Sequence, residues 1–247
     1  MKFLPILFAL LITHSLLGQS DKELAEQSVN QNIIKSHIGF LASDELRGRD
    51  TGSPELKIAS QYIKSRFVEY GVDLAEGMET YFQEVPMKTV SPAKSGSLKL
   101  GESEFKFGDD FILMDGDQPT LEGRIVFVGY GTEQELKKKK LEGAIVVSLC
   151  GDGTSESPQA WFSQSAKKGE RFKELGAVAS VELYNSVQIP WNLLTRFFNR
   201  EQTILDSGTE SFTRIWLNRS QDSISELDKK KTEGSINIEL GETEKFM

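Results

Sequence analysis

The sequence predicts a mixed α/β (α+β) protein, with a helical N-terminal part followed by a β-rich part that has flanking helices. Two observations carry this prediction. Before residue 88 the apolar residues recur at the spacing of amphipathic helices. After it, short β-branched runs separated by turn residues are typical of strands. The change between residues 88 and 96 is therefore the predicted domain boundary.

The first 18 residues have the layout of a secretory signal peptide. Lys2 precedes an apolar run over residues 3–12, and Gly18 is a small residue near the predicted cleavage point. The apolar run is too short to span a membrane. The sequence therefore predicts a secreted or periplasmic protein without membrane contact once residues 1–18 are removed.

The helical part, residues 19–90, is predicted to contain two amphipathic helices. The first covers residues 29–41. Its apolar stripe is formed by Ile33, Ile34, Ile38 and Leu41. The second helix begins where Ser53 can cap it and Pro54 fits its first position, and it ends at Gly71, a typical left-handed stop. Its apolar stripe consists of Leu56, Ala59, Ile63, Phe67 and Tyr70.

The β-rich part, residues 91–240, is predicted to begin with a hairpin of alternating strands at residues 97–100 and 104–107. Continuous apolar runs at residues 124–131 and 144–149 indicate strands covered on both faces. The other predicted strands are an edge strand over 80–87 and strands over 177–183, 212–217 and 235–240. The predicted helices are one over 158–175 closed by Gly176, a short one inside the connection 189–206, and one over 221–231.

Charge and cysteine content exclude several classes of function. The chain has 29 basic and 37 acidic residues, and removal of Lys2 with the signal leaves 28 against 37, a net charge of −9. Nucleic acid is a poor partner for such a surface. The lysine run at residues 137–140 is expected to be a solvated loop or helix face. Cys150, the single cysteine, forms no internal disulfide, and the apolar run before it predicts burial.

Most residue sets of hydrolytic sites are missing from the sequence. Outside the signal His37 is the one histidine, and its spacing places it on the first helix. Residues 153–157 lack the last glycine of a nucleophile elbow, and no zinc-peptidase helix motif occurs. One cysteine and one histidine are too few for a closed zinc site. Three acidic pairs remain open for a two-carboxylate mechanism, although solvated turns also favour such pairs: Asp44 with Glu45, Asp109 with Asp110, and Asp115 with Asp117.

Two further motifs are weak. Gly129 and Gly131 begin like a dinucleotide loop, but Gln134 stands where the third glycine belongs. The segment around Asp115 and Asp117 lacks the later ligands of an EF-hand calcium loop. The residues Asn218, Arg219 and Ser220 form a formal glycosylation sequon.

Residues 38–72, followed by YFQEVPM at residues 81–87, resemble the N-terminal segment of secreted zinc aminopeptidases, metallopeptidase family twenty-eight. Residues 126–131, 141–152 and 174–183 resemble the protease-associated (PA) domain that many members insert after that segment. The resemblance covers about residues 29–240. It implies the N-terminal helical arm of a zinc-exopeptidase fold over residues 19–90, a PA domain over 91–240, and the start of a return to the catalytic domain over 241–247.

The resemblance also implies a chemistry. Family members remove N-terminal residues from peptides with two zinc ions, held by histidines and carboxylates, and a glutamate base. Those residues lie in the sheet domain after the PA domain, and this sequence ends at Met247. No catalytic, cofactor-binding or metal-binding residue can therefore be assigned here, no cofactor is expected in this chain, and the chain is predicted to be inactive alone.

The expected function is that of a non-catalytic portion of an aminopeptidase-like protein, whose PA domain acts as a lid, a substrate-access element or an interaction module. Expected partners are peptides or the missing catalytic domain, not nucleic acid. Two alternatives stay open. One is a metallopeptidase that is functional only when a second chain completes it, and the other is a free-standing peptide- or glycan-binding protein.

The turn between the two helices contains Arg47 and Arg49 around Gly48. Glycines here permit the reversal that sets the second helix against the first. Arg47 and Arg49 are expected to form salt bridges that stabilise the loop, with substrate contact in a complete enzyme as the alternative. Without the peptidase sheet, the apolar stripe of the second helix is expected to be exposed.

Overall fold

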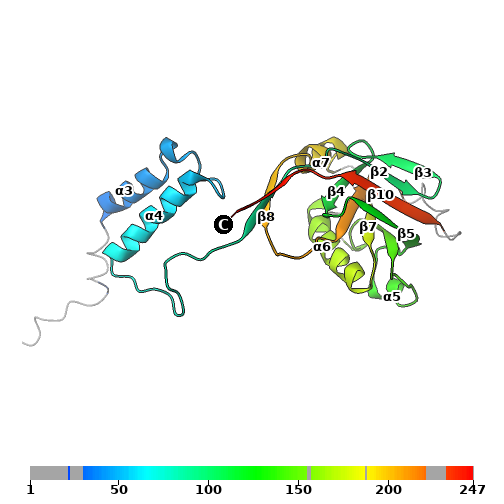
Figure 1. Ribbon diagram of the computed structural model, residues 1–247, viewed down its shortest axis with the longest axis horizontal. Coiled ribbons are helices and arrows are strands. Elements are labelled where there is room, and N and C mark those ends of the chain that lie inside the picture. The colour runs from blue at the N-terminus through cyan, green and yellow to red at the C-terminus, as the bar shows by residue number, and fades with distance from the viewer. Residues whose placement is uncertain (1–21, 23–29, 155–156, 187, 221–231, 247) are drawn as a thin grey trace, which may run out of the picture. The chain divides into compact units, whose positions relative to one another are not determined.

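The computed structural model describes Lys22 and residues 30–154, 157–186, 188–220 and 232–246. Helices form its N-terminal part and a large sheet with helices forms the rest (Figure 1), so the predicted mixed α/β class is confirmed. The chain divides into two compact units between Gln83 and Glu84. The predicted signal peptide and the predicted helix over residues 221–231 lie outside the described residues.

The first unit contains the two predicted helices. Helix α3 spans Gln31–Leu41, the short 3₁₀ helix η2 spans Asp44–Leu46, and α4 spans Pro54–Glu69. Asn30 caps α3, because its side-chain oxygen accepts a hydrogen bond from the backbone N–H of Asn32 at 2.8 Å.

The ends of α4 follow from local sequence signals. Ser53 caps the helix, since its hydroxyl oxygen accepts a hydrogen bond from the N–H of Leu56 at 3.1 Å. Gly71 has φ +65°, and the N–H of Val72 donates to the carbonyl of Phe67 at 2.9 Å. This is the Schellman arrangement, in which a left-handed residue satisfies the last carbonyls of the helix. Both predicted ends are confirmed.

The second unit begins with a small antiparallel sheet of order β11-β1-β8. Its strands are β1 (Met87–Val90), β8 (Gln202–Leu205) and β11 (Thr243–Phe246). The predicted strand over residues 80–87 is wrong: the ladder starts only after Pro86, because both partner strands lie opposite residues 87–90. The second unit as a whole begins at Glu84.

The second unit also holds an eight-stranded sheet of order β3-β2-β10-β5-β6-β7-β9-β4. The neighbours from β5 through β6 and β7 to β9 are parallel, and the remaining neighbours are antiparallel. The strands are β2 (Ser95–Leu100), β3 (Ser103–Lys106), β4 (Phe111–Asp115), β5 (Thr120–Phe127), β6 (Ala144–Leu149), β7 (Ala179–Leu183), β9 (Thr213–Leu217) and β10 (Glu233–Glu239).

Most predicted elements of this sheet are confirmed, with shifted ends. The hairpin of β2 and β3 turns at Gly101, which has φ +63°. Strand β5 starts and ends earlier than predicted. At Gly123 the strand lies close to the segment at Gly143, because a Cβ on Gly123 would be 2.5 Å from the Gly143 carbonyl oxygen. The strand ends before the turn at Gly129, which has φ +58°. Strand β4 of this sheet and the three strands of the small sheet, β1, β8 and β11, were not predicted.

Three helices accompany the sheet: α5 (Glu133–Leu136), α6 (Pro158–Glu174) and α7 (Trp191–Phe198). The last two confirm the predicted helices in their segments. Helix α6 packs against β7 and β9, and α7 packs against β4. None of the helices in the described ranges combines the length and hydropathy needed to cross a bilayer.

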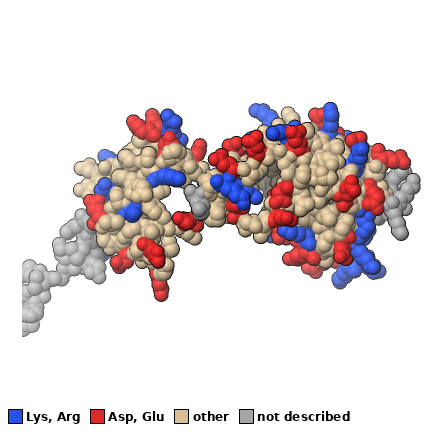
Figure 2. Space-filling view, in the orientation of Figure 1, with Lys and Arg blue, Asp and Glu red and all other residues tan. Residues whose placement is uncertain are grey.

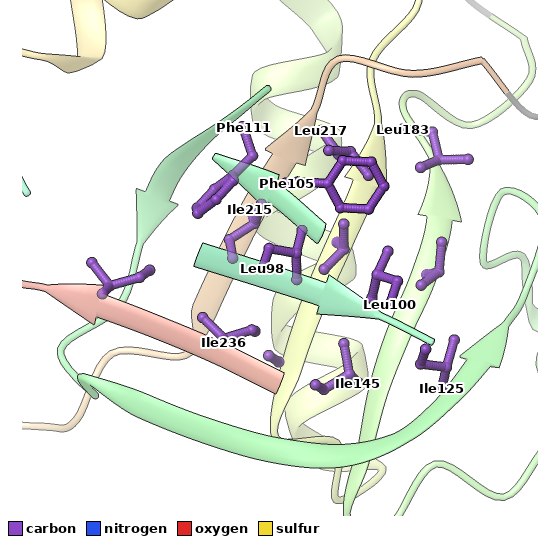
Figure 3. Close-up of a cluster of buried hydrophobic side chains, with 14 of the residues drawn as sticks. Leu98, Leu100, Phe105, Phe111, Ile125, Ile145, Leu183, Ile215, Leu217 and Ile236 are labelled. Carbon is purple, nitrogen blue, oxygen red and sulfur yellow. The ribbon is translucent and has the colours of Figure 1, made fainter. Parts of the chain in front are cut away.

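The parallel strands are buried on both faces, which explains their continuous apolar sequences. On one face, residues of β2 and β10 such as Leu98 and Ile236 meet residues of the parallel strands such as Ile145 and Leu183 (Figure 3). On the other face, Val146 packs with Phe172 of α6. A third cluster of mainly aromatic side chains surrounds Trp216.

Candidate functional site

A cleft of about 210 Å³ lies in the second unit, between the small sheet and loops at the edge of the large sheet. One wall consists of alternate residues of the three small strands. Lys88 lies opposite Ile204 in the register of β1 and β8, and Val90 lies opposite Gln202 and Thr243. Because side chains alternate between the faces of a strand, all five point to the same side of the small sheet.

The other wall combines apolar and acidic residues. The apolar ones are Phe107, Leu113, Met114, Phe198 and Leu240. The acidic ones are Asp115 and Asp117, so the structure places one predicted acidic pair at the cleft. Gly116 separates them with φ +134°, and a Cβ there would lie 2.6 Å from the Thr213 hydroxyl oxygen.

Both carboxylates of this pair already have partners. Asp115 forms an ion pair with Arg214, with 3.3 Å between Oδ2 and Nη2, and its other oxygen accepts a hydrogen bond from the Gly116 N–H. Asp117 accepts a hydrogen bond from the Ser211 N–H at 2.9 Å. These contacts fix the loops that form the wall.

The other two predicted acidic pairs lie elsewhere. Asp44 and Glu45 are exposed residues of η2 in the first unit. Asp110 forms an ion pair with Arg219 of the sequon at 2.8 Å and accepts a hydrogen bond from the Lys106 N–H. Asp109 contributes its backbone carbonyl, which accepts a hydrogen bond from the Trp191 indole N–H.

Two cationic side chains, Lys88 and Arg200, also line the cleft. The Arg200 guanidinium lies 4.2 Å from the centroid of the Phe197 ring. Lys88 lies directly opposite Lys245 in β11, and Lys245 forms an ion pair with Asp206 at 2.7 Å. The hydrogen bond from Lys245, a backbone N–H from Gly208 and the charges of both lysines hold the pKa of Asp206 below its usual value.

Neither Lys88 nor Arg200 forms an ion pair with an acidic side chain in the part of the chain that the structure describes. Sequence reasoning missed both residues. No sequence signal marks Lys88, because the four residues MKTV are too few for the period of a strand to be recognised.

A polar layer lies between α6 and the parallel strands. Lys168 of α6 forms an ion pair with Glu182 of β7, and its ammonium group donates to the Leu149 carbonyl at 2.7 Å. Cys150 lies nearby and is 6% exposed, so its predicted burial is confirmed. Burial and the negative charge of Glu182 raise the pKa of the Cys150 thiol well above its usual value, which disfavours the reactive thiolate.

The turn after β5 holds no free anion site. The Glu135 carboxylate accepts hydrogen bonds from the N–H of Thr132 at 2.9 Å and from the N–H of Tyr130 at 3.3 Å. Partial burial opposes this ionised form, but the hydrogen bonds bring the pKa of Glu135 below its usual value. The backbone donors that a nucleotide phosphate would need are therefore already used. The lysines at residues 137–140, which follow α5, are exposed as predicted.

His37 joins the two helices of the first unit. Its Nδ1 lies 2.8 Å from the Tyr62 hydroxyl, and its Nε2 lies 2.8 Å from the Tyr70 hydroxyl. The ring of Phe40, one turn further along α3, stacks on Tyr62 with 4.4 Å between centroids. The prediction that His37 is a helix residue is confirmed.

Replacing His37 by alanine should loosen α3 from α4, because two hydrogen bonds, each contributing about 1 kcal/mol, are lost together. Hydrogen exchange of the α3 amides should accelerate roughly tenfold or more. Lys35→Ala, an exposed change on the same helix, is the matched control. Equal exchange rates in the two variants would contradict this role for His37.

The turn between the helices is strained. Arg47, Gly48 and Arg49 have φ values of +43°, +82° and +59°, a region that residues other than glycine rarely adopt. The Arg47 guanidinium lies 3.9 Å from the carboxylate of Glu55, but its side chain is 81% exposed, so this ion pair contributes little. Arg49 forms no ion pair within the described ranges, so the expected salt bridges reduce to one weak pair.

Many apolar side chains of the first unit are exposed, and much of its visible surface carries no charge (Figure 2). Helix α3 has no buried residue, and α4 buries only Ala59. Of the predicted apolar stripe, Ile63, Phe67 and Tyr70 are exposed, at 41%, 40% and 56%, but Leu56 is half-buried and Ala59 is buried, so the predicted exposure is observed only in part.

The described residues bring together no zinc site of the kind that the resembled family has. Across residues 30–154, 157–186, 188–220 and 232–246, no three side chains of His, Cys, Asp or Glu converge where they could hold a metal ion. Both ring nitrogens of His37 are engaged by tyrosine hydroxyls.

A search with protein-family models finds no match for this sequence, and a search of curated proteins finds none either. Among solved structures, the chain is similar to an aminopeptidase from Aneurinibacillus sp. strain AM-1. The sequences are 18% identical, the match covers 89% of this chain, and the TM-score is 0.45. The chain spans about half the length of that aminopeptidase, with 46% of it covered.

Proposed function

We propose that this chain is a secreted or periplasmic, non-catalytic part of an aminopeptidase-like protein, and that its second unit is an inserted interaction module that binds peptides. The observation that carries the proposal is the cleft between the small and large sheets, which joins apolar walls to charged groups. Its 210 Å³ is below the roughly 300–1,000 Å³ of drug-sized ligand sites, so it suits a peptide end or one or two side chains.

The small sheet supports the proposal of an inserted module. Strand β1, where the second unit begins, pairs antiparallel with β11, so Met87 lies opposite Phe246 and Val90 lies opposite Thr243. Adjacent entry and exit strands are what an inserted domain needs, because the host domain must continue close to where it was interrupted. The sequence resemblance to a PA domain supports the same organisation.

The exposed apolar surface of the first unit favours one alternative, in which a second chain covers these helices and completes a metallopeptidase. Ile38 is 61% exposed and Val68 is 59% exposed. Apolar surface gathered on two neighbouring helices is typical of an interaction site. In this alternative the cleft of the second unit would still present peptides to the completed enzyme.

Peptide binding can be tested at one strand. Ile204 lines the cleft, whereas Leu205 points to the opposite face of β8. Ile204→Asp should weaken peptide binding about tenfold or more, because it replaces an apolar side chain of the small-sheet wall by a charged one, while Leu205→Asp should leave the affinity unchanged. Calorimetric titration of the purified chain with short peptides measures both.

An activity assay on the purified chain tests whether it catalyses hydrolysis in addition to binding peptides. The purified chain with added zinc should not hydrolyse a chromogenic aminoacyl substrate. Turnover by this chain alone that a chelator abolishes would overturn the non-catalytic proposal. Binding of glycans with no binding of peptides would favour the free-standing glycan-binding alternative.

A further inference from the structure

We infer that the cleft selects peptides that present a carboxylate, and that Lys88 and Arg200 are the groups that bind it. The inference rests on the proposed peptide binding and adds the chemical class of the ligand. The carboxylate can be the C-terminus of the peptide or the side chain of an acidic residue.

The charges around the cleft do not cancel. The two acids in its wall are engaged, Asp115 by Arg214 and Asp117 by a backbone N–H. The two cations Lys88 and Arg200 have no acidic partner within the described ranges. Four charged side chains line the cleft, and Arg214 neutralises one of them from outside, so a local positive charge remains. Charges of both signs are interspersed on the visible face of the second unit (Figure 2), which makes this excess a local feature.

The register of the small sheet places a second positive charge beside Lys88. Lys88 lies directly opposite Lys245, and like charges at directly opposite positions of an antiparallel pair destabilise it. Asp206 forms the ion pair with Lys245, at 2.7 Å, and the charge of Lys88 also acts on that carboxylate, so one acid serves two ammonium groups. A ligand carboxylate in the cleft would supply a second counter-charge for these two lysines.

The apolar wall indicates what accompanies the carboxylate. Phe107, Leu113 and Phe198 line the same cleft as the two cations. A carboxylate that binds a lysine or arginine forms charge-assisted hydrogen bonds, which are about twice as strong as neutral ones. A peptide end with an apolar last side chain would use both parts of the cleft together.

Four matched peptides test the inference on the intact chain: a tripeptide ending in leucine with a free C-terminus, its C-terminal amide, and amides with glutamate or glutamine at the middle position. The wild-type protein should bind either peptide that has a carboxylate about tenfold more tightly than its uncharged counterpart. Preference for the free C-terminus alone, or for glutamate alone, identifies the source of the carboxylate. Raised salt should reduce the preference.

Variants assign the preference to residues. Lys88→Met and Arg200→Met should each reduce the tenfold preference several-fold, whereas Lys99→Met, whose lysine pairs with Glu104, should keep it. Equal binding of all four peptides by the wild-type protein would overturn this inference and leave peptide binding in place. Binding of none of them would overturn both the inference and the proposed function. Because these outcomes are measured on the wild-type protein with the four peptides, they test the inference even if a variant fails to fold.

Discussion

Replacing Lys168 by methionine should destabilise the second unit by about 3–5 kcal/mol, because it leaves the Glu182 carboxylate buried without its partner. Lys168 is 7% exposed and Glu182 is 1% exposed, so water cannot replace the lost ion pair. The Leu149 carbonyl, which accepts a hydrogen bond from the Lys168 ammonium, is left unsatisfied as well. Urea unfolding followed by tryptophan fluorescence measures the change.

Two further variants separate charge burial from simple side-chain loss. Lys167→Met changes the neighbouring exposed lysine and should alter the stability by less than about 0.5 kcal/mol. The double variant Lys168→Met with Glu182→Leu should regain most of the stability, since replacing both partners of a buried pair by apolar residues is often neutral or stabilising. A double variant as unstable as Lys168→Met alone would show that the ion pair is not the reason.

Local signals made parts of the fold predictable. The ends of α4 follow from Ser53 and Gly71, which act on backbone groups within a few residues along the chain. Strand β6 was predicted at its observed bounds, because a strand covered on both faces needs a continuous apolar run. Both features depend on residues that are neighbours in sequence.

The small sheet could not be predicted in this way. Its strands have four residues each, and β1 pairs with strands more than a hundred positions away, at Leu205 and Phe246. No periodicity develops over four residues. The cleft could not be predicted for the same reason, because Lys88 and Thr243 come together only through the pairing of β1 with β11.

The candidate site was predictable only in part. Asp115 and Asp117 were found as an acidic pair, but the sequence does not show that Arg214 and the Ser211 N–H already engage them. Glu182 did carry a signal that was missed. A carboxylate within the apolar strand ASVEL requires a buried cationic partner, and Lys168 supplies it from α6.

Replacing Trp216 by alanine should destabilise the second unit by about 3–5 kcal/mol, as expected for the loss of a fully buried aromatic side chain. The indole stacks on two rings, with centroids 4.8 Å from Phe162 and 5.2 Å from Tyr184. Its N–H also donates to the hydroxyl of Ser165 at 3.4 Å. Thermal unfolding followed by circular dichroism measures the loss.

This change should reach the cleft as well. Phe162 also stacks on Phe198, with 6.0 Å between centroids, and Phe198 lines the cleft. A cavity at Trp216 frees Phe162 to shift, and Phe198 then loses the ring that supports it. Peptide affinity should therefore fall in Trp216→Ala under conditions where the variant is still folded. Leu193→Ala, an exposed change on α7, should leave both stability and affinity unchanged, so an equal loss of affinity in the two variants would contradict transmission through the stacked rings.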